Sequence, residues 1–273
     1  MPARFAPSAG LVVKGKKTMK KTNGYIIYRG PSELDGAPIV VVATGFAKGS
    51  RNSKTGGGLI QTWILRDDID PVVAANTGAD SSICGQCPHR GVIITMPDGT
   101  LLNKDRSCYV TLFQAPLNVY RTLHRGNYPV ADDLTELFDG HGVRLGAYGD
   151  PAAVPLEVWQ AVMSGAAFGT GYTHQWLTAP LGFAEYVMAS CDSAAERAMA
   201  VAMGYRTFTV RAASDPLVEG EIACPASAEA GHRTTCDKCK ACGGTASKAK
   251  CNIAIIAHGA PSKVNAFITR LPA

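Results

Sequence analysis

Short apolar runs separated by turn residues mark the first quarter of the chain. The runs at 25–28, 39–42 and 62–65 consist mainly of aromatic, β-branched and aliphatic residues and are short enough to be β-strands. A stretch at 45–58 is rich in Gly, Ser, Asn, Lys and Thr, and this composition predicts a loop. A short helix is expected around 69–75.

The second half of the chain alternates between strand and helix patterns. Strands are expected at 143–148, 169–173, 185–189, 206–210 and 252–257, and helices at 156–166 and 193–203. Leu156, Trp159, Val162 and Met163 lie on one face of the first helix, and Ser193 is a suitable N-cap for the second. Helices of this kind join parallel strands. The pattern therefore predicts an α/β fold with a complete or partial parallel (β/α) barrel.

The expected organisation is a single domain with two cysteine-rich insertions. The barrel-like domain is expected to span 23–273, with the insertions at about 84–108 and 224–251. Residues 1–22 are rich in lysine, and we expect them to form a basic, disordered leader, with Met19 as an alternative start of translation.

The composition is that of an ordinary globular protein. Of the 273 residues, 46% are apolar and 18% are charged, which argues against a disordered chain. No apolar run reaches the ~18 residues of a membrane-spanning helix, and the start shows no secretory signal pattern. We therefore expect no membrane partner. Nine cysteines, an odd number in clusters, favour a reducing cytoplasm.

The charge pattern suits a polyanionic partner. The net charge is +5, and basic residues are concentrated in the leader and in 233–250. Each phosphate that such a patch neutralises releases counterions, so a nucleic acid or nucleotide is the expected partner. The oligomeric state is left open.

The denser group of cysteines contains two Cys-x-x-Cys steps in succession. Cys236, Cys239 and Cys242 bring three sulfur atoms into one small volume, as Zn²⁺ or an iron–sulfur cluster requires. A fourth ligand could come from Cys224, Cys251 or His258.

The second group lies earlier in the chain. Cys84 and Cys87 are followed by His89, and Cys108 lies further on. His89 could complete a Cys₃His zinc site with the three thiolates. Alternatively, the three thiolates could hold a [4Fe–4S] cluster and leave one iron open for a ligand. Cys191 lies outside both groups and is typical of a buried free thiol.

Polar residues follow several of the expected strands. Asp150, His174, Asp192 and Arg211 occupy such positions, and the carboxyl edge of parallel strands is where active sites form. Asp150 could be a nucleophile, a base or the acceptor for a cofactor amine, or it could only cap the next helix. His174 could be a base, a ligand or a structural residue. Asp192 and Arg211 could orient a substrate or bridge neighbouring strand ends.

The order of these features resembles the radical S-adenosylmethionine barrel over about residues 80–260. The resemblance implies that Cys84, Cys87 and Cys108 hold a [4Fe–4S] cluster. It also implies that Gly149, Asp150 and Pro151 form the turn that binds the methionine amine of S-adenosylmethionine. C-terminal cysteines often hold auxiliary clusters in that family. Its usual spacing is Cys-x₃-Cys-x₂-Cys, whereas this chain has Cys-x₂-Cys and then a gap of about twenty residues.

Two further resemblances concern the C-terminal cysteines. The chain resembles uncharacterised bacteriophage proteins with a cysteine group, a strand ending in Gly-Asp and a Cys-x₂-Cys-x₂-Cys tail. It is also similar to the guanine transglycosylases, some of which exchange deazaguanine into DNA. This similarity implies zinc bound by Cys236, Cys239, Cys242 and His258, with Asp150 or Asp192 as the nucleophile.

Three classes of function remain, and the sequence favours the first. It is a metal-dependent enzyme, using iron–sulfur or zinc, that modifies a nucleic-acid base or nucleotide by a radical route or by base exchange. The second is a non-catalytic, zinc-stapled nucleic-acid-binding protein. The third is a structural virion or interaction protein, which the alternation of strands and helices disfavours.

Overall fold

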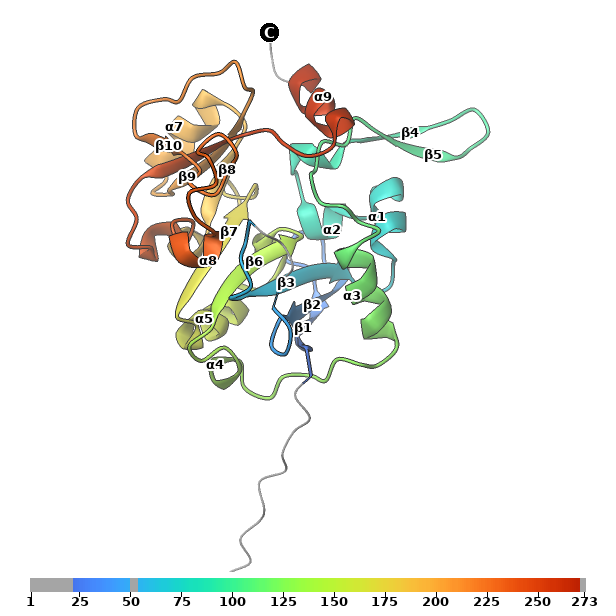
Figure 1. Cartoon of the computed structure of the whole chain (residues 1–273). Helices are drawn as coiled ribbons and strands as arrows, with labels where there is room; N and C mark the ends of the chain where they lie inside the picture. Colours follow the sequence, from blue (N-terminus) through green and yellow to red (C-terminus); the bar gives the residue numbers. More distant parts are fainter. Residues whose placement is uncertain (1–21, 50–53, 271–273) are drawn as a thin grey trace, which may run out of the picture.

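One large sheet organises the molecule. The structure, a computed structural model, describes residues 22–49 and 54–270, and in them nine strands form a sheet with the order β1-β2-β3-β6-β7-β8-β9-β11-β10 (Figure 1). The strands are β1 (Gly24–Pro31), β2 (Pro38–Thr44), β3 (Leu59–Arg66), β6 (Gly142–Tyr148), β7 (Phe168–Thr173), β8 (Met188–Cys191), β9 (Thr207–Arg211), β10 (Glu221–Ala223) and β11 (Asn252–Ile256).

The sheet is antiparallel at one end and parallel over the rest. β2 pairs antiparallel with β1 and β3, whereas every pairing from β3 through β6 to β10 is parallel. The expected α/β fold with a mostly parallel sheet is thus confirmed. Among the described residues the edge strands β1 and β10 do not pair with each other, so the sheet is open there.

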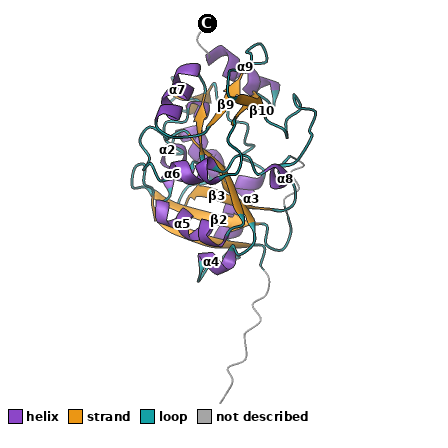
Figure 2. Ribbon diagram, turned by 90° about the vertical axis from the view of Figure 1, so that its left-hand side faces the viewer, coloured by secondary structure: helices purple, strands orange, loops and turns teal. Residues whose placement is uncertain are grey.

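The connecting helices follow one another along one side of the parallel strands. They are α5 (Leu156–Gly165), α6 (Phe183–Tyr186) and α7 (Ala194–Ala202), and Figure 2 shows them along the same side of the molecule. Right-handed connections between successive neighbouring strands produce this arrangement. Trp159 and Val162 of α5 are fully buried in the same core cluster as Val143 and Leu145 of β6. The alternate residues of β6 therefore face the other way.

The other helices lie around the sheet and its cysteine-rich segments. They are α1 (Pro71–Thr77), α2 (Ser81–Cys84), α3 (Ala115–His124), α4 (Leu134–Leu137), α8 (Cys236–Cys239) and α9 (Pro261–Arg270), with short 3₁₀ turns η1 (Pro88–Arg90), η2 (Pro151–Ala153) and η3 (Gly244–Ala246). A hairpin of β4 (Val92–Thr95) and β5 (Leu101–Lys104) projects from the body, and α9 lies beside its base (Figure 1). None of the helices in this part of the chain is long and apolar enough to cross a membrane.

Most expected elements are present, and one is shifted. The strand expected at 185–189 begins later, at Met188, because Phe183–Tyr186 form the helix α6. Ser193 caps α7 as expected, since its side chain accepts a hydrogen bond from the amide of Glu196. The expected disordered leader lies outside the described residues, apart from Thr22. The cysteine-rich C-terminal region lies between β9 and β11.

Candidate functional site

A cavity of about 420 Å³ lies over the face of the parallel strands that the connecting helices leave uncovered. Most of its floor comes from residues at alternate positions of three strands: Arg144, Gly146 and Tyr148 from β6, Thr170 and Tyr172 from β7, and Phe208 and Val210 from β9. Successive residues of a strand point to opposite faces, so this alternation marks one face of the sheet. The volume falls within the range of small-molecule sites.

Two segments far apart in sequence cover this floor. The first is the loop that contains Cys84, Cys87, His89, Ser107 and Cys108, and the second is α9, with Lys263, Val264 and Phe267. The two segments are tied together, because the ammonium group of Lys263 donates to the carbonyl of Val110 at 3.1 Å. The cavity is therefore bounded by the sheet, the first cysteine group and the C-terminal helix.

The first cysteine group lines the cavity as a set. Cys84, Cys87 and Cys108 all contribute to its wall, and none of them forms a disulfide. Burial raises the pKa of Cys84 and of Cys87 well above the usual value, and the neighbouring thiol groups raise both further. A bound cation has the opposite effect, because it favours the thiolate form. The chemistry of this donor set fits a metal centre.

The spacing of the sulfur atoms bears on which metal centre fits. In the described part of the chain, only one group of three His, Cys, Asp or Glu residues has its ligand atoms within 4.8 Å of one another, and it contains no cysteine. A tetrahedral zinc ion with Zn–S bonds of ~2.3 Å holds its sulfurs ~3.8 Å apart. In a [4Fe–4S] cluster each thiolate binds a different iron, which requires a wider separation. Neither cysteine group is thus a preformed zinc tetrahedron.

The C-terminal cysteines form the second group. Cys224, Cys236, Cys239 and Cys242 belong to one apolar cluster at β11, and Cys236 also reaches the cavity wall. Burial, assisted by the neighbouring Cys224, Cys236 and Cys239 and opposed by a hydrogen bond with Tyr172, raises the pKa of Cys242 to about 12. Of the three residues considered as the fourth ligand, Cys224 is the one whose charge acts on both Cys236 and Cys242.

The other two residues considered as the fourth ligand have different surroundings. Cys251 packs against the same apolar cluster, and its backbone carbonyl accepts a hydrogen bond from Arg206. His258 lines the cavity and stacks on Tyr109, with ring centroids 5.8 Å apart. Burial and the nearby charge of Lys54 lower the pKa of His258. The structure therefore groups Cys224, rather than His258, with the three C-terminal thiols.

Three residues from separate segments meet at the carboxyl ends of β7 and β8. His89 Nε2 lies 3.1 Å from Asp192 Oδ1, and His174 Nε2 lies 3.9 Å from Asp192 Oδ2. The two imidazole rings are in edge contact, with centroids 5.3 Å apart. We call these residues the His–His–Asp group. His174 and Asp192 thus lie together, as two of the sequence-predicted catalytic residues.

Arg270 of α9 adds a positive charge beside this group. Its guanidinium lies 3.7 Å from Asp192 Oδ2 and also contacts His89 and Ser107. Burial alone would raise the pKa of Asp192. The hydrogen bond to His89 and the charges of His89, His174 and Arg270 outweigh burial and hold it below the usual value. The carboxylate is therefore ionised and available to a cation.

Asp150 connects the end of β6 to the end of β7. Its carboxylate accepts hydrogen bonds from the amide of Ala152 at 3.0 Å, the hydroxyl of Thr173 at 2.7 Å and the amide of His174 at 2.8 Å. Burial raises its pKa, and these hydrogen bonds oppose the increase. Asp150 lines the cavity, yet it caps η2 and fixes the backbone of His174. The capping role considered from the sequence is present.

The remaining sequence-predicted residues lie at different distances from the cavity. Gly149 lines it and has φ +84°, and an added Cβ would approach the Cβ of Ile64 to 2.6 Å, so a side chain is excluded there. Pro151 is buried next to it in η2. Arg211 is not among the lining residues and pairs with Glu229. The structure therefore does not bring Arg211 to Asp192.

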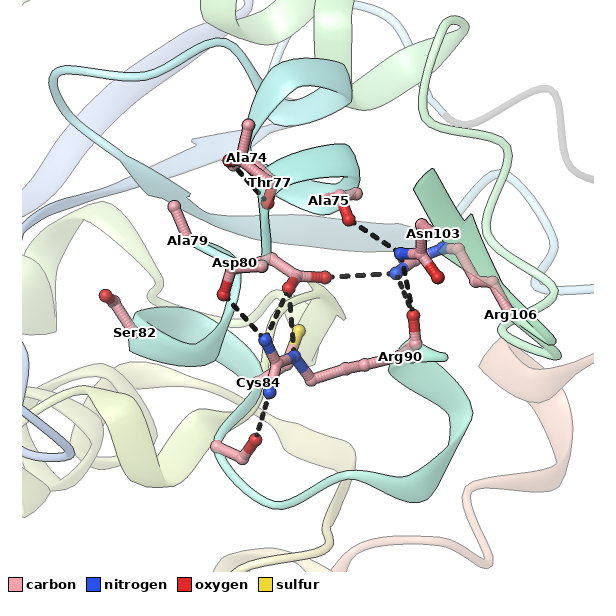
Figure 3. Close-up of polar contacts among 12 residues, drawn as sticks. Ala74, Ala75, Thr77, Ala79, Asp80, Ser82, Cys84, Arg90, Asn103 and Arg106 are labelled. Atoms are coloured by element: carbon pink, nitrogen blue, oxygen red, sulfur yellow. Dashed lines mark hydrogen bonds and ion pairs between the residues drawn. The ribbon is translucent and has the colours of Figure 1, made fainter. Parts of the chain in front are cut away.

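A buried ion-pair network stabilises the first cysteine loop (Figure 3). Asp80 is 1% exposed and pairs with Arg90 at 2.7 Å and with Arg106 at 3.0 Å. Arg90 also donates to the carbonyls of Gly78 and Gly85. In addition, the backbone carbonyl of Asp80 accepts a hydrogen bond from the amide of Cys84. The carboxylate of Asp80 thus links Arg106, which lies two residues before Cys108, to the segment that leads to Cys84.

The low pKa of His174 predicts an acid-sensitive stability. Burial lowers this pKa from 6.5 to about 4, with Asp192 opposing and the charges of His89 and Arg270 assisting. The unfolded chain therefore binds the proton first, so this stability is present above pH 6.5 and is lost as the pH falls toward 4. For chelator-treated protein we expect a loss of about 3 kcal/mol in the free energy of unfolding at pH 4. Urea unfolding of the wild type and of His174→Gln, at pH 4 and above pH 6.5, measures this loss. An equal dependence on pH in the two proteins would contradict the prediction.

Sequence reasoning missed several residues of the site. Ser107, Phe267 and Arg270 contact His89, and the guanidinium of Arg144 contacts the Tyr109 hydroxyl on the cavity wall. The one available signal was the amphipathic pattern of 261–270, which predicts that one face of a helix packs on the body. The pairing of a helix end with a distant loop leaves no local pattern.

Comparison of the chain with protein-family models, with curated proteins and with solved structures finds no match.

Proposed function

We propose that the protein is a metal-dependent enzyme that modifies a nucleotide or nucleic-acid base, with an iron–sulfur cluster and S-adenosylmethionine as cofactors. The observation that carries the proposal is the position of Cys84, Cys87 and Cys108 together on the wall of the cavity. A cluster held by these three thiolates would leave one iron for a ligand, and the cavity that they line would offer space for that ligand. The interior of a closed barrel is filled with side chains. A partial barrel, open between β1 and β10, would leave room there for the cofactor and the substrate.

The floor of the cavity favours a substrate with an anionic part and a flat ring. Arg144 of the floor and Lys54 both line the cavity, and both are cations suited to a phosphate or carboxylate. The nearby Tyr109 raises the pKa of Arg144, against the effect of burial, so its guanidinium stays charged. Tyr172 and Phe208 are also in the lining and have ring centroids 4.1 Å apart. They offer an aromatic surface on which a base can stack.

The roles of the chain in such a reaction follow from its contacts. When bound, the cluster would supply an electron for reductive cleavage of S-adenosylmethionine. Arg144 would hold the anionic part of the substrate, and the apolar wall with Val210 and Ile255 would exclude water. His174, held neutral by its low pKa, would line the substrate space as an uncharged imidazole. Asp150 would position His174 through its backbone amide.

The second cysteine group fits a structural metal centre. Cys224, Cys236, Cys239 and Cys242 are packed on β11, and a metal held by them would fix the chain between β9 and β11. A zinc ion or an auxiliary iron–sulfur cluster would serve this purpose. Thiol-bound centres of either kind suit a reducing cytoplasm, which in a bacteriophage protein is that of the host.

A second candidate reaction is zinc-supported base exchange of the guanine transglycosylase type. The observation in its favour is that Asp192 Oδ2 is buried without a hydrogen-bond partner, as a carboxylate nucleophile would be. The place of His258 away from the second cysteine group makes it the weaker proposal.

Cleavage of S-adenosylmethionine tests the first proposal. Protein purified without oxygen, reconstituted with iron and sulfide and reduced with dithionite is expected to form 5′-deoxyadenosine and methionine from S-adenosylmethionine. Cys87→Ser should reduce this rate at least tenfold, whereas Cys191→Ala, a buried thiol outside the cavity lining, should preserve it. Absence of product from fully reconstituted wild-type protein would refute the radical route.

A further inference from the structure

We infer that His89, His174 and Asp192 form a binding site for one divalent transition-metal ion, separate from both cysteine groups. One ligand atom from each residue lies within 4.8 Å of the others, and no other group of three His, Cys, Asp or Glu among the described residues has this geometry. The inference does not depend on the proposed iron–sulfur chemistry, because it uses no thiol. It concerns nitrogen and oxygen ligands only.

Two buried atoms of the group lack the partners that buried polar atoms normally have. His174 Nε2 and Asp192 Oδ2 are buried and form no hydrogen bond, although they face each other at 3.9 Å. Each such atom costs ~1–3 kcal/mol when it is left unsatisfied. One cation between an imidazole nitrogen and a carboxylate oxygen satisfies both, which explains why the fold keeps them together.

The surroundings hold the ligand residues in place, as in metal sites with an ordered outer shell. His89 Nδ1 lies 2.8 Å from the Ser107 hydroxyl, which leaves Nε2 directed at Asp192. The ring of His89 stacks on Phe267, with centroids 5.7 Å apart. The backbone amide of His174 donates to Asp150. Metal-binding histidines typically donate a hydrogen bond from the other ring nitrogen. Arg270 now donates to His89 Nδ1 at 3.2 Å, so His89 Nδ1 can donate to Ser107 only once Arg270 has moved away.

Arg270 acts as the counter-charge of Asp192 until a metal ion arrives. Its guanidinium lies 3.7 Å from Asp192 Oδ2, so it competes with a bound cation electrostatically. Arg270 is the last residue of α9, and its side chain can move away as the ion binds. Replacing it with glutamine removes the competing charge. The Arg270→Gln variant should therefore bind the ion as tightly as the wild type, or more tightly.

The ligand types define the class of ion. Two imidazoles and one carboxylate suit Zn²⁺, Fe²⁺ or Mn²⁺, whereas Mg²⁺ and Ca²⁺ prefer oxygen ligands. Three protein ligands leave further coordination positions for water or substrate. Both histidines line the cavity, so these positions face the space in which the substrate would lie. The ion would then bind or polarise an oxygen atom of that substrate.

Manganese binding followed by electron paramagnetic resonance tests the inference. Mn²⁺ prefers nitrogen and oxygen ligands to thiolates, so titration of the full chain with MnCl₂ reports this site and not the cysteine groups. The wild type is expected to bind one Mn²⁺ ion, with nitrogen couplings from two imidazoles. His174→Gln and Asp192→Asn should each weaken binding at least tenfold. His258→Gln, a histidine of the same cavity outside the group, should bind like the wild type.

Other outcomes would overturn the inference. No Mn²⁺ site in the wild type, absence of nitrogen coupling, or equal loss in His258→Gln would each do so. Some variants could fail to fold, so thermal unfolding of the wild type with and without MnCl₂ provides a second test. Mn²⁺ raises the unfolding temperature only if the folded protein binds it. A wild type that binds no Mn²⁺ but still cleaves S-adenosylmethionine would refute the metal site and leave the proposed function unaffected.

Discussion

Replacement of Asp80 by alanine is expected to lower the free energy of unfolding by about 3–5 kcal/mol. Asp80 is 1% exposed and is the shared partner of Arg90 and Arg106, whose side chains are 20% and 14% exposed. Its removal leaves two positive charges close together and without a carboxylate. Breaking a buried pair from one side has this large effect because the remaining charge stays desolvated.

Urea unfolding of Asp80→Ala and of Asp68→Ala measures the effect against a matched control. Asp68 pairs with Arg66 at 2.9 Å but is 48% exposed, and exposed pairs contribute ~0–1 kcal/mol. A loss below ~1 kcal/mol for Asp80→Ala would mean that water reaches the network. In Asp80→Ala we also expect Cys84 and Cys87 to react faster with a thiol reagent, since the loop that buries them is loosened.

Replacement of Asp150 by alanine is expected to destabilise the protein by a similar amount, about 3–5 kcal/mol. The variant leaves the hydroxyl of Thr173 and the amides of Ala152 and His174 without their acceptor. Each unsatisfied buried donor costs ~1–3 kcal/mol. The ends of β6 and β7 would separate, and the His–His–Asp group would lose its support.

Asp150→Asn distinguishes this structural role from catalysis. The amide keeps one acceptor oxygen, so we expect a smaller loss of about 2 kcal/mol, measured by urea unfolding. Thr173→Val, which removes one of the three hydrogen bonds, should cost about 1 kcal/mol. An Asp150→Asn protein that is as stable as the wild type yet inactive would instead indicate that the carboxylate takes part in the reaction.

Much of the fold could be predicted, because its signals are local. The apolar runs at 39–42 and 252–257 became strands in which Val41 and Ala254 are fully buried. Glycine and capping residues fixed several ends, as Ser193 does for α7. The start of β8 was placed too early, because Glu185 lies in the helix α6 and strand pairing begins only at Met188.

The site could be predicted only where neighbouring strands place it. His174 and Asp192 follow β7 and β8, which are adjacent in the sheet, so their meeting follows from strand order. Asp150 was recognised as a residue of this edge and as a candidate cap, whereas its hydrogen bonds to Thr173 and His174 leave no local pattern. Arg211 follows β9 in the same way, yet its side chain turns to Glu229. A strand end fixes the position of a residue but not the direction of its side chain.

The rest of the site depends on contacts that leave no sequence pattern. His89 meets Asp192 across 103 positions, and Arg270 meets His89 across 181. The choice of Cys224 as the companion of the C-terminal thiols likewise arises from the packing of the loop on β11. Such pairings depend on how loops close over the sheet, which local propensities do not determine.

The iron and acid-labile sulfide content of protein purified without oxygen tests the central claim most directly. With Cys84, Cys87 and Cys108 as cluster ligands, the wild type should contain about four irons and four sulfides at this site and absorb near ~400 nm. Cys84→Ser, Cys87→Ser and Cys108→Ser should each lose that share, whereas Cys191→Ala should keep it. A colourless wild type without iron, or one whose iron is unaffected by these three substitutions, would contradict the account.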